Sequence, residues 1–163
     1  MTSELLSDQR RPKGSRTADA DAVLHGAAAE RVAALDQRYT ASRRALVHAM
    51  LEAARPLTIT EILAGAKGMP QSSAYRNLTV LCEAGVARRL PGVDDLGRFE
   101  LAEDLAGHHH HLQCTECGTL LDFDASAQLE QALVAAARRV AAETGFEITG
   151  HRLDFDGRCP RCQ

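Results

Sequence analysis

The chain has 163 residues, of which 45% are apolar and 25% are charged, which is the composition of an ordinary globular protein with room for one domain or two small ones. Its longest alanine-rich stretch, residues 132–142, contains Arg138 and Arg139 and is too polar to cross a membrane. The charged N-terminus lacks the apolar core of a secretory signal. We therefore expect a cytoplasmic protein with no membrane partner.

The net charge of −3 is distributed unevenly. Residues 1–101 hold 14 of the 19 basic and 12 of the 22 acidic residues, a net charge of +2, whereas residues 102–163 hold 5 and 10, a net charge of −5. This asymmetry favours a nucleic-acid-binding half followed by an acidic half that holds cations.

The first part of the chain predicts a polar tail and a helix. Residues 1–20 are polar and include a basic run over residues 10–16, which predicts a disordered tail that either contacts DNA phosphates or is solvated without a role. Apolar residues then recur at helical spacing from Leu24 to Leu35, which predicts a helix over about residues 20–35.

Three further helices are predicted before residue 86. The first covers residues 41–53 and ends before Pro56. Thr58 and Glu61 form a capping-box pattern at the start of a short helix over residues 59–66. The last begins near Ser72 and ends at Gly85, a predicted left-handed cap. Cys82 falls on the apolar face of this last helix, so we interpret it as a core residue.

Two strand-like runs follow, over residues 86–90 and 98–101, with a predicted hairpin loop at residues 91–95. Helices followed by a hairpin predict a winged helix-turn-helix, whose reader helix would begin near Ser72 and enter the major groove of DNA. Arg88 and Arg89 on the predicted wing would add phosphate contacts. The residues predicted to contact DNA are Ser72, Ser73, Tyr75, Arg76 and Asn77 at the start of the reader helix, and Arg43 and Arg44 on an earlier helix.

The character of the chain changes after a polar hinge at residues 102–107. Strands are predicted over residues 108–114, 119–123 and 147–155, and a helix over residues 126–144 with an apolar stripe. The overall prediction is an α+β fold: an N-terminal winged helix-turn-helix domain and a small C-terminal α/β domain.

Four of the five cysteines form two Cys-x-x-Cys pairs, Cys114/Cys117 and Cys159/Cys162. Two intervening residues allow both sulfurs of a tight turn to face one ion, and two such turns together provide a tetrahedral site suited to Zn²⁺. Gly118 removes a side chain where the first turn closes. A structural zinc would thus join the C-terminal tail to the start of the domain; two disulfides or a redox switch are the alternatives.

A run of four histidines, residues 108–111, precedes the first cysteine pair. In a strand, alternate residues point to opposite faces, so His109 and His111 would share one face, and His108 and His110 the other. One run can therefore supply two separate metal sites. Acidic residues occur on both sides of it, and mixed imidazole and carboxylate ligands suit Fe²⁺, Zn²⁺, Mn²⁺ or Ni²⁺.

Together these motifs resemble the ferric uptake regulator (Fur) family over about residues 38–163. The matching motifs are Ser73-Ala74-Tyr75-Arg76-Asn77-Leu78 with Gly85-Val86, Phe99-Glu100, the stretch from His108 to Gly118 with Asp122-Phe123, His151, and Cys159-x-x-Cys162. The resemblance implies a homodimer, with an N-terminal extension at residues 1–37, a winged-helix domain at 38–101, a hinge at 102–107 and a dimerisation and metal-binding domain at 108–163.

The resemblance also implies three metal sites. The structural zinc would be held by Cys114, Cys117, Cys159 and Cys162; the sensing site by His109, His111, Glu100 and Asp122; and a further site by His108, His110, Glu130 and His151. The sensed ion would be Fe²⁺ or Zn²⁺, with Mn²⁺ or Ni²⁺ as alternatives.

The sequence departs from the family pattern where many members supply a sensing ligand just before the third helix, because Arg55-Pro56-Leu57 offers none here. His25, Glu103 and Asp104 are candidates to replace that ligand.

The resulting hypothesis is a metal-dependent repressor of metal-homeostasis genes that binds a pseudo-palindromic DNA operator as a homodimer, and neither an enzyme nor a binder of a small-molecule substrate. The alternatives are a peroxide sensor of the same fold, a zinc-ribbon interaction module without DNA specificity, and a metalloenzyme. The absence of a His-Glu-x-x-His motif argues against the metalloenzyme.

Overall fold

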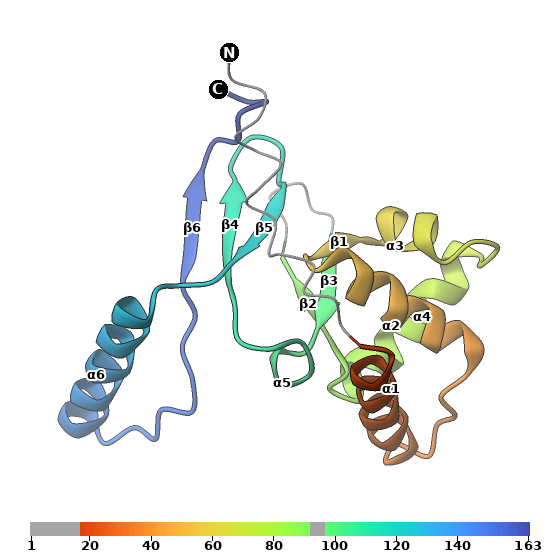
Figure 1. Cartoon of the computed structure of the whole chain (residues 1–163), viewed down its shortest axis with the longest axis horizontal. Helices are drawn as coiled ribbons and strands as arrows, with labels where there is room; N and C mark the ends of the chain where they lie inside the picture. The colour runs from red at the N-terminus through yellow and green to blue at the C-terminus, as the bar shows by residue number, and fades with distance from the viewer. Residues whose placement is uncertain (1–16, 92–96) are drawn as a thin grey trace.

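The computed structural model describes residues 17–91 and 97–163 (Figure 1). The predicted basic run at residues 10–16 and most of the predicted hairpin loop, residues 92–95, lie outside the described residues. None of the described helices combines the length and apolar composition needed to cross a membrane.

The first half of the chain contains four helices: α1 (Ala18–Ala33), α2 (Ala41–Ala53), α3 (Ile59–Gly65) and α4 (Gln71–Glu83). All four predicted helices are confirmed. The predicted capping box is present, since the Thr58 hydroxyl accepts from the Glu61 amide and the Glu61 carboxylate accepts from the Thr58 amide. Gly85 follows α4 with a φ of 65°, a left-handed conformation that favours glycine.

A three-stranded antiparallel sheet completes this half, with β1 (Leu57–Thr58), β2 (Ala87–Leu90) and β3 (Arg98–Leu101) in the order β1-β3-β2. The arrangement of helices and hairpin is the winged helix-turn-helix that the sequence predicts. In this arrangement β3 is the central strand, and all four of its residues are buried.

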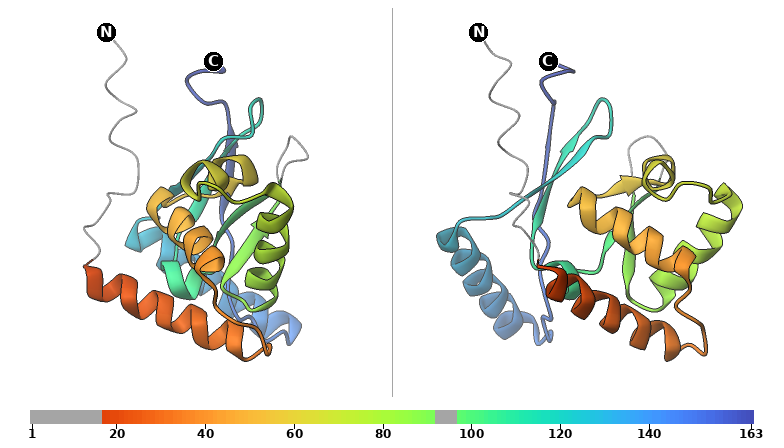
Figure 2. Two further views of the ribbon diagram at one scale, coloured as in Figure 1. Left: turned by 90° about the vertical axis from the view of Figure 1, so that its right-hand side faces the viewer. Right: turned by 45° about the vertical axis from the view of Figure 1, so that its right-hand side comes forward.

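One apolar core joins the helices to this sheet. It includes Leu24 and Val32 of α1, so the helix in the predicted N-terminal extension packs into the same core as the winged helix. Figure 2 shows α1 running along the outside of the other helices. Cys82 packs against this core, as predicted. Leu35, expected on the inner face of the first helix, is 41% exposed because α1 ends at Ala33.

The second half begins at the predicted hinge, where the structure has a one-turn helix, α5 (Glu103–Ala106). This helix forms because Leu105 and Ala106 pack against the core of the first half. A second sheet follows, of β4 (His110–Cys114), β5 (Leu120–Phe123) and β6 (Asp154–Gly157), in the order β5-β4-β6. Strand β4 is antiparallel to β5 and parallel to β6.

The strand predicted over residues 147–155 is wrong for most of its length. Pairing with β4 begins only at the register pair His111–Asp154, and β6 ends at Gly157. The alternating residues before Asp154 have no neighbouring strand in the described part of the chain. Alternation makes a strand only where a neighbouring strand pairs with it, and in the described residues β4 first contacts this segment at the Leu153 carbonyl, which accepts from the His111 amide over 3.4 Å.

Helix α6 (Ala127–Thr144) joins β5 to β6 and buries none of its residues. Val134 and Val140 are 43% and 42% exposed, and Phe146 just after the helix is 74% exposed. Figure 1 shows α6 standing away from the sheets. Among the described residues, no element fully buries the apolar stripe of α6.

Candidate metal centres and nucleic-acid interface

The two cysteine turns meet because β6 runs parallel to β4. Cys114 is the last residue of β4, and beside it the Thr115 amide donates to the Gly157 carbonyl at the end of β6, over 2.8 Å. Gly118 has a φ of 66°, which closes the first turn back toward β5 without a side chain in the way. Each Cys-x-x-Cys turn thus leaves the end of one strand, and the strands are neighbours.

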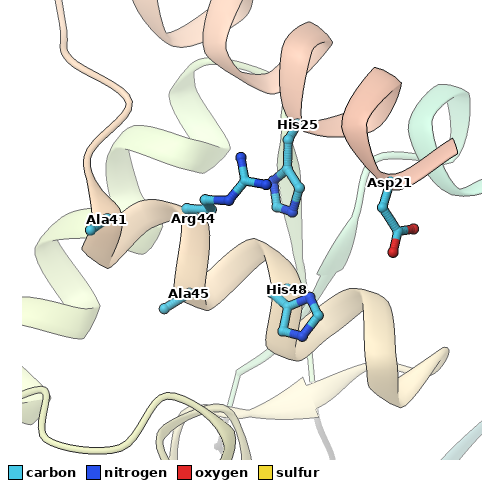
Figure 3. Close-up of a pocket in the computed structure, with 6 residues that line it drawn as sticks. All are labelled: Asp21, His25, Ala41, Arg44, Ala45 and His48. Atoms are coloured by element: carbon cyan, nitrogen blue, oxygen red, sulfur yellow. The ribbon is translucent and has the colours of Figure 1, made fainter. Parts of the chain in front are cut away.

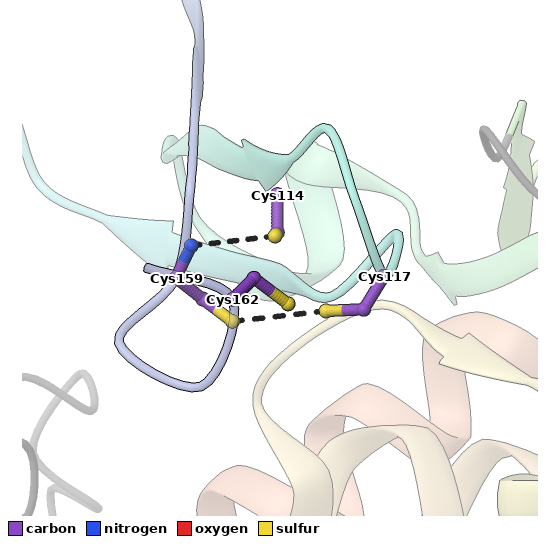
Figure 4. A group of neighbouring side chains, drawn as sticks. All are labelled: Cys114, Cys117, Cys159 and Cys162. Carbon is purple, nitrogen blue, oxygen red and sulfur yellow. Dashed lines mark hydrogen bonds between the residues drawn. The ribbon is translucent and has the colours of Figure 1, made fainter.

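The four sulfurs converge on one point, all within 4.8 Å of one another (Figure 4). The Cys117 and Cys159 sulfurs lie 3.7 Å apart, and the Cys159 amide donates to the Cys114 sulfur over 3.3 Å. All five cysteines are free thiols, so the two-disulfide alternative is not the arrangement of this structure. Four thiol sulfurs around one point fit a tetrahedral zinc ion.

Backbone amides already favour the thiolate at one of these sulfurs. Donation from the amides of Cys117 and Cys159 lowers the pKa of Cys114 to about 6. The pKa of Cys162 is raised to about 12, first through its hydrogen bond with Cys159. Four neighbouring thiols cannot all ionise without a cation, and a divalent metal supplies the charge that would deprotonate them together.

A second cluster joins the two sheets. Glu100, on β3, meets His109, His111 and Asp122, which lie on or beside β4 and β5, and all four side chains are buried. The Glu100 Oε2 atom lies 3.4 Å from His109 Nε2 and 3.0 Å from His111 Nε2. Asp122 faces His111 across the β4–β5 ladder, with 3.9 Å between its Oδ1 atom and His111 Nε2.

The two imidazoles are oriented by oxygen atoms behind them. His109 Nδ1 donates to the Gly107 carbonyl over 2.8 Å, and His111 Nδ1 lies 3.1 Å from the Asp154 carboxylate. Such contacts direct Nε2 of each ring into the cluster, as in protein metal sites. Two imidazole nitrogens and two carboxylates around one buried point fit a divalent transition-metal ion.

Close contacts shift the pKa values of three buried groups in the second cluster. Burial raises the pKa of Glu100, but its hydrogen bonds with His109 and His111 and the charge of Arg88 outweigh this and lower the pKa to about 2. The hydrogen bond with Glu100 raises the pKa of His109. Burial lowers the pKa of His111, but the contacts with Glu100 outweigh this effect and raise it. Both shifts favour the protonated form of the histidines.

A third cluster lies on the other side of β4. Glu130 of α6 places its Oε1 atom 2.7 Å from His110 Nε2 and 3.3 Å from His108 Nε2. Its Oε2 atom lies 3.3 Å from His151 Nε2. The hydrogen bond with His110 lowers the pKa of Glu130. The structure thus separates the four consecutive histidines into two sets, divided as the strand alternation predicts.

None of the three suggested replacement ligands joins His109 and His111 in a potential metal-binding group. His25 Nδ1 instead lies 2.7 Å from the Tyr39 hydroxyl, in a surface pocket between α1 and α2 of about 420 Å³ that is also lined by Arg44 and His48 (Figure 3). Asp104 pairs with Arg31 of α1.

Glu103 hydrogen-bonds His108, beside the third cluster. It also lies 3.9 Å from Arg88, which pairs with Glu100.

The predicted DNA-contacting residues fall into two groups. Tyr75, Arg76 and Ser72 are exposed on the first turns of α4. In contrast, Arg43 is 8% exposed and donates to the Asn77 side-chain oxygen over 3.2 Å and to the Gln37 side chain over 3.1 Å. Arg43 and the half-buried Asn77 thus join α2 to α4, and their contact with DNA stays a prediction.

Among the remaining predicted contacts, Ser73 is half-buried and its carbonyl accepts from the Asn77 side chain over 2.9 Å. Arg44 is exposed. On the wing, Arg88 is occupied by the Glu100 contact, whereas its neighbour Arg89 is exposed.

Comparison with known proteins gives a match to the ferric uptake regulator family over residues 34–156. The chain belongs to the ferric uptake regulator family. It is 34% identical to the ferric uptake regulation protein of Bacillus subtilis over 92 residues, covering 56% of this chain and 58% of that protein. It is 30% identical to the peroxide-responsive repressor PerR of Staphylococcus aureus strain USA300 over 141 residues, covering 82% of this chain and 90% of that protein.

The structure of the Helicobacter pylori ferric uptake regulator Fur, which reveals three functional metal binding sites in that protein, has the same fold. Its TM-score is 0.68 at 20% identity, with 87% of this chain and 93% of that chain covered. At this identity the likeness speaks for the fold alone.

Sequence reasoning about this Fur family member missed Asp154 behind His111, and it gave other roles to Glu103, which contacts His108 of the third cluster, and to Arg88, which contacts Glu100. No motif marks them. The parallel register of β6 on β4 places Asp154 beside His111. The one-turn helix α5 carries Glu103. Pairing of β2 with β3 places Arg88 opposite Glu100, a cross-strand pair that the predicted hairpin could have suggested.

Proposed function

We propose that this Fur family member is a homodimeric, metal-dependent DNA-binding repressor of metal-homeostasis genes, acting in the cytoplasm. The observation that carries the proposal is the second cluster, because Glu100 belongs to the wing sheet while His109, His111 and Asp122 belong to the second sheet. An ion bound there would link the DNA-binding half to the other half. The sensed ion is proposed as Fe²⁺ or Zn²⁺, with Mn²⁺ and Ni²⁺ as alternatives.

The four cysteines are proposed to hold a permanent structural zinc. Their sulfurs already lie within 4.8 Å of one another, and a closed set of four cysteines leaves no open position for chemistry. His108, His110, Glu130 and His151 are proposed as a further metal site, since three imidazoles and a carboxylate surround one point there.

DNA recognition is assigned to the first turns of α4, where Ser72, Tyr75 and Arg76 are exposed. Arg44 and Arg89 are proposed phosphate contacts. The domain division is proposed as predicted, with the hinge at residues 102–107. Two reader helices spaced about one turn of DNA apart, on the order of 34 Å, would bind a pseudo-palindromic operator.

Dimerisation is supported by the apolar surface that the single chain leaves uncovered. Val140 on the apolar stripe of α6, and Ile148 and Phe155 after the helix, are each more than a third exposed. A second copy packed against this face would bury it and bring two DNA-binding halves into one particle.

The mechanism follows from the bridging position of Glu100. Without metal, its carboxylate contacts His109 and His111 and raises the pKa of both histidines. The same side chains, with Asp122, would hold a divalent ion, which would strengthen the link between the two sheets and favour one angle between the DNA-binding halves. A coupling of about 1–3 kcal/mol between metal and DNA is enough for a usable switch.

The test combines metal analysis with DNA binding. Purified protein should retain about one zinc per chain after mild chelation, and DNA binding should return on adding one particular divalent metal. A double variant, His109→Ala with His111→Ala, should keep the zinc but lose the metal response. His48→Ala, an exposed histidine outside all three clusters, is the matched control. A metal response unchanged in the double variant would contradict the assignment.

Peroxide sensing is the second candidate, favoured by the 90% coverage of the PerR relative and by Asp122 in the cluster. It predicts addition of one oxygen atom to His109 or His111 when iron-loaded protein meets hydrogen peroxide, visible by mass spectrometry. The absence of any specific DNA footprint would instead favour a zinc-ribbon interaction module.

A further inference from the structure

Arg88 places a permanent positive charge directly behind the sensing cluster. It lies on β2, opposite Glu100 of β3, and its Nε donates to the Glu100 Oε1 atom. Its Nη1 atom lies 3.9 Å from Glu103 Oε2. The Arg88 side chain is only 24% exposed, whereas the neighbouring Arg89 is exposed. Of two consecutive arginines, one is therefore committed to the metal cluster.

The two oxygens of Glu100 serve different partners. Oε1 accepts from Arg88, while Oε2 faces His109 and His111. Arg88 therefore does not occupy the position of a metal ion bound through Oε2. Both cations can contact the same carboxylate at once, so the guanidinium charge would remain beside the ion.

The two carboxylates of the cluster, Glu100 and Asp122, carry two negative charges, and Arg88 adds one positive charge directly beside them. A divalent ion held by these carboxylates would therefore be repelled by the guanidinium.

We propose that Arg88 sets the metal affinity of the sensing site: its fixed charge weakens the binding of a divalent ion and keeps the site reversible. This inference rests on the proposed sensing function. It makes the wing strand part of the sensor, because the residue that limits metal affinity belongs to the DNA-binding half.

Arg88 acts here through charge rather than by orienting its partner. Glu100 lies on the central strand of its sheet, and its ligand oxygen is held by both His109 and His111. Removing the guanidinium therefore leaves Glu100 facing the histidines. The loss of a neighbouring positive charge should then strengthen cation binding.

The experiment measures the dissociation constant for Mn²⁺, an air-stable probe, by chelator competition on the zinc-containing full chain. R88Q should bind Mn²⁺ about tenfold more tightly, the effect of removing one unit charge a few ångströms from a divalent ion. R88K keeps the charge and should bind as the wild type does. R89Q makes the same change in net charge at the exposed neighbour and should also leave Mn²⁺ affinity unchanged. Circular dichroism and a zinc content of about one per chain verify that each variant is folded.

Unchanged or weaker Mn²⁺ binding by folded R88Q, with normal binding by the wild type, would overturn this inference and leave the proposed function standing. An equal gain in R89Q would also overturn it, because net charge alone would then account for the effect. If the wild type binds none of Mn²⁺, Fe²⁺ or Zn²⁺ at this cluster, the proposed function fails, and this inference fails with it.

Discussion

At Glu100, the contacts that lower the carboxyl pKa to about 2 also raise the pKa of His109 and His111. The carboxylate is therefore ionised at neutral pH, and the histidines hold protons more strongly than free imidazole does. A divalent ion held by His109 and His111 would compete with protons for the imidazole nitrogens, whereas the Glu100 carboxylate is already charged. We therefore expect metal binding at this site to be weakened as pH falls.

The same shifts predict how the stability of the metal-free protein depends on pH. The histidine contribution is present below the ordinary pKa of about 6.5 and is lost as pH rises through the raised values. The Glu100 contribution is lost only as pH falls from about 4.5 toward 2. We expect the melting temperature of the chelated, full-length protein, measured by calorimetry, to fall as pH rises from about 6 to 9. In the double variant His109→Ala with His111→Ala, the melting temperature should change less over that pH range. An equally steep decline would show that these two histidines do not cause the pH dependence.

The exposed and buried arginines of the DNA-binding half should respond differently to substitution. Arg76→Ala should weaken DNA binding and reduce the slope of log affinity against log salt by about 1, with little change in stability. Arg43→Ala should lower the free energy of unfolding by about 1.5–3 kcal/mol, because it removes charged hydrogen bonds in a buried position. Urea denaturation and fluorescence anisotropy at several salt concentrations separate the two effects. Equal loss of stability in the Arg43→Ala and Arg76→Ala variants would contradict the distinction between a buried, stabilising Arg43 and an exposed Arg76.

At the scale of the element, β4 serves all three clusters. His111 and His110 point to opposite sides of it, and Cys114 ends it. Because a strand presents alternate residues to its two faces, this one strand of five residues contributes a side chain to each of the three sites. Its neighbour β6 is short, and its register determines where the second cysteine turn meets the first.

Loss of one cysteine ligand should therefore release β6 as well as the metal. Cys114→Ser should lower the zinc content from about one per chain to near zero and remove hydrogen-exchange protection from residues 154–157. Cys82→Ala is the control, because this thiol packs against the helical core and lies outside the four-cysteine cluster. Zinc retained by Cys114→Ser at full occupancy would contradict the four-cysteine assignment.

At the scale of the molecule, the two halves differ in how they are stabilised. The first half buries a continuous apolar core from α1 to β3, whereas α6 buries nothing in the single chain. We therefore expect the second half to depend on metal ligation and on contact with another surface. In a dimer, that surface would be the same face of a second copy.

A charge on the apolar stripe of α6 should therefore disrupt the dimer. Val140→Asp should raise the dimer dissociation constant by more than about tenfold, because an unpaired carboxylate in an apolar interface is costly. Gln131→Asp adds the same charge on the opposite side of the helix and should leave the dimer intact. Sedimentation analysis at several concentrations measures both. A Val140→Asp variant that remains fully dimeric would exclude this face.

The sequence alone determined the features that depend on spacing along the chain. Helical periodicity predicted α1 to α4, the Cys-x-x-Cys spacing predicted two metal-binding turns, and alternation divided the histidines into two sets. These patterns follow from the fixed geometry of helices, strands and tight turns. Only the tertiary structure decided which distant residues meet: Arg88 with Glu100, Arg43 with Asn77, and Asp154 with His111. It also showed that residues 147–153 form no strand, because strand formation requires a neighbour, and neighbours are determined by register and packing between elements.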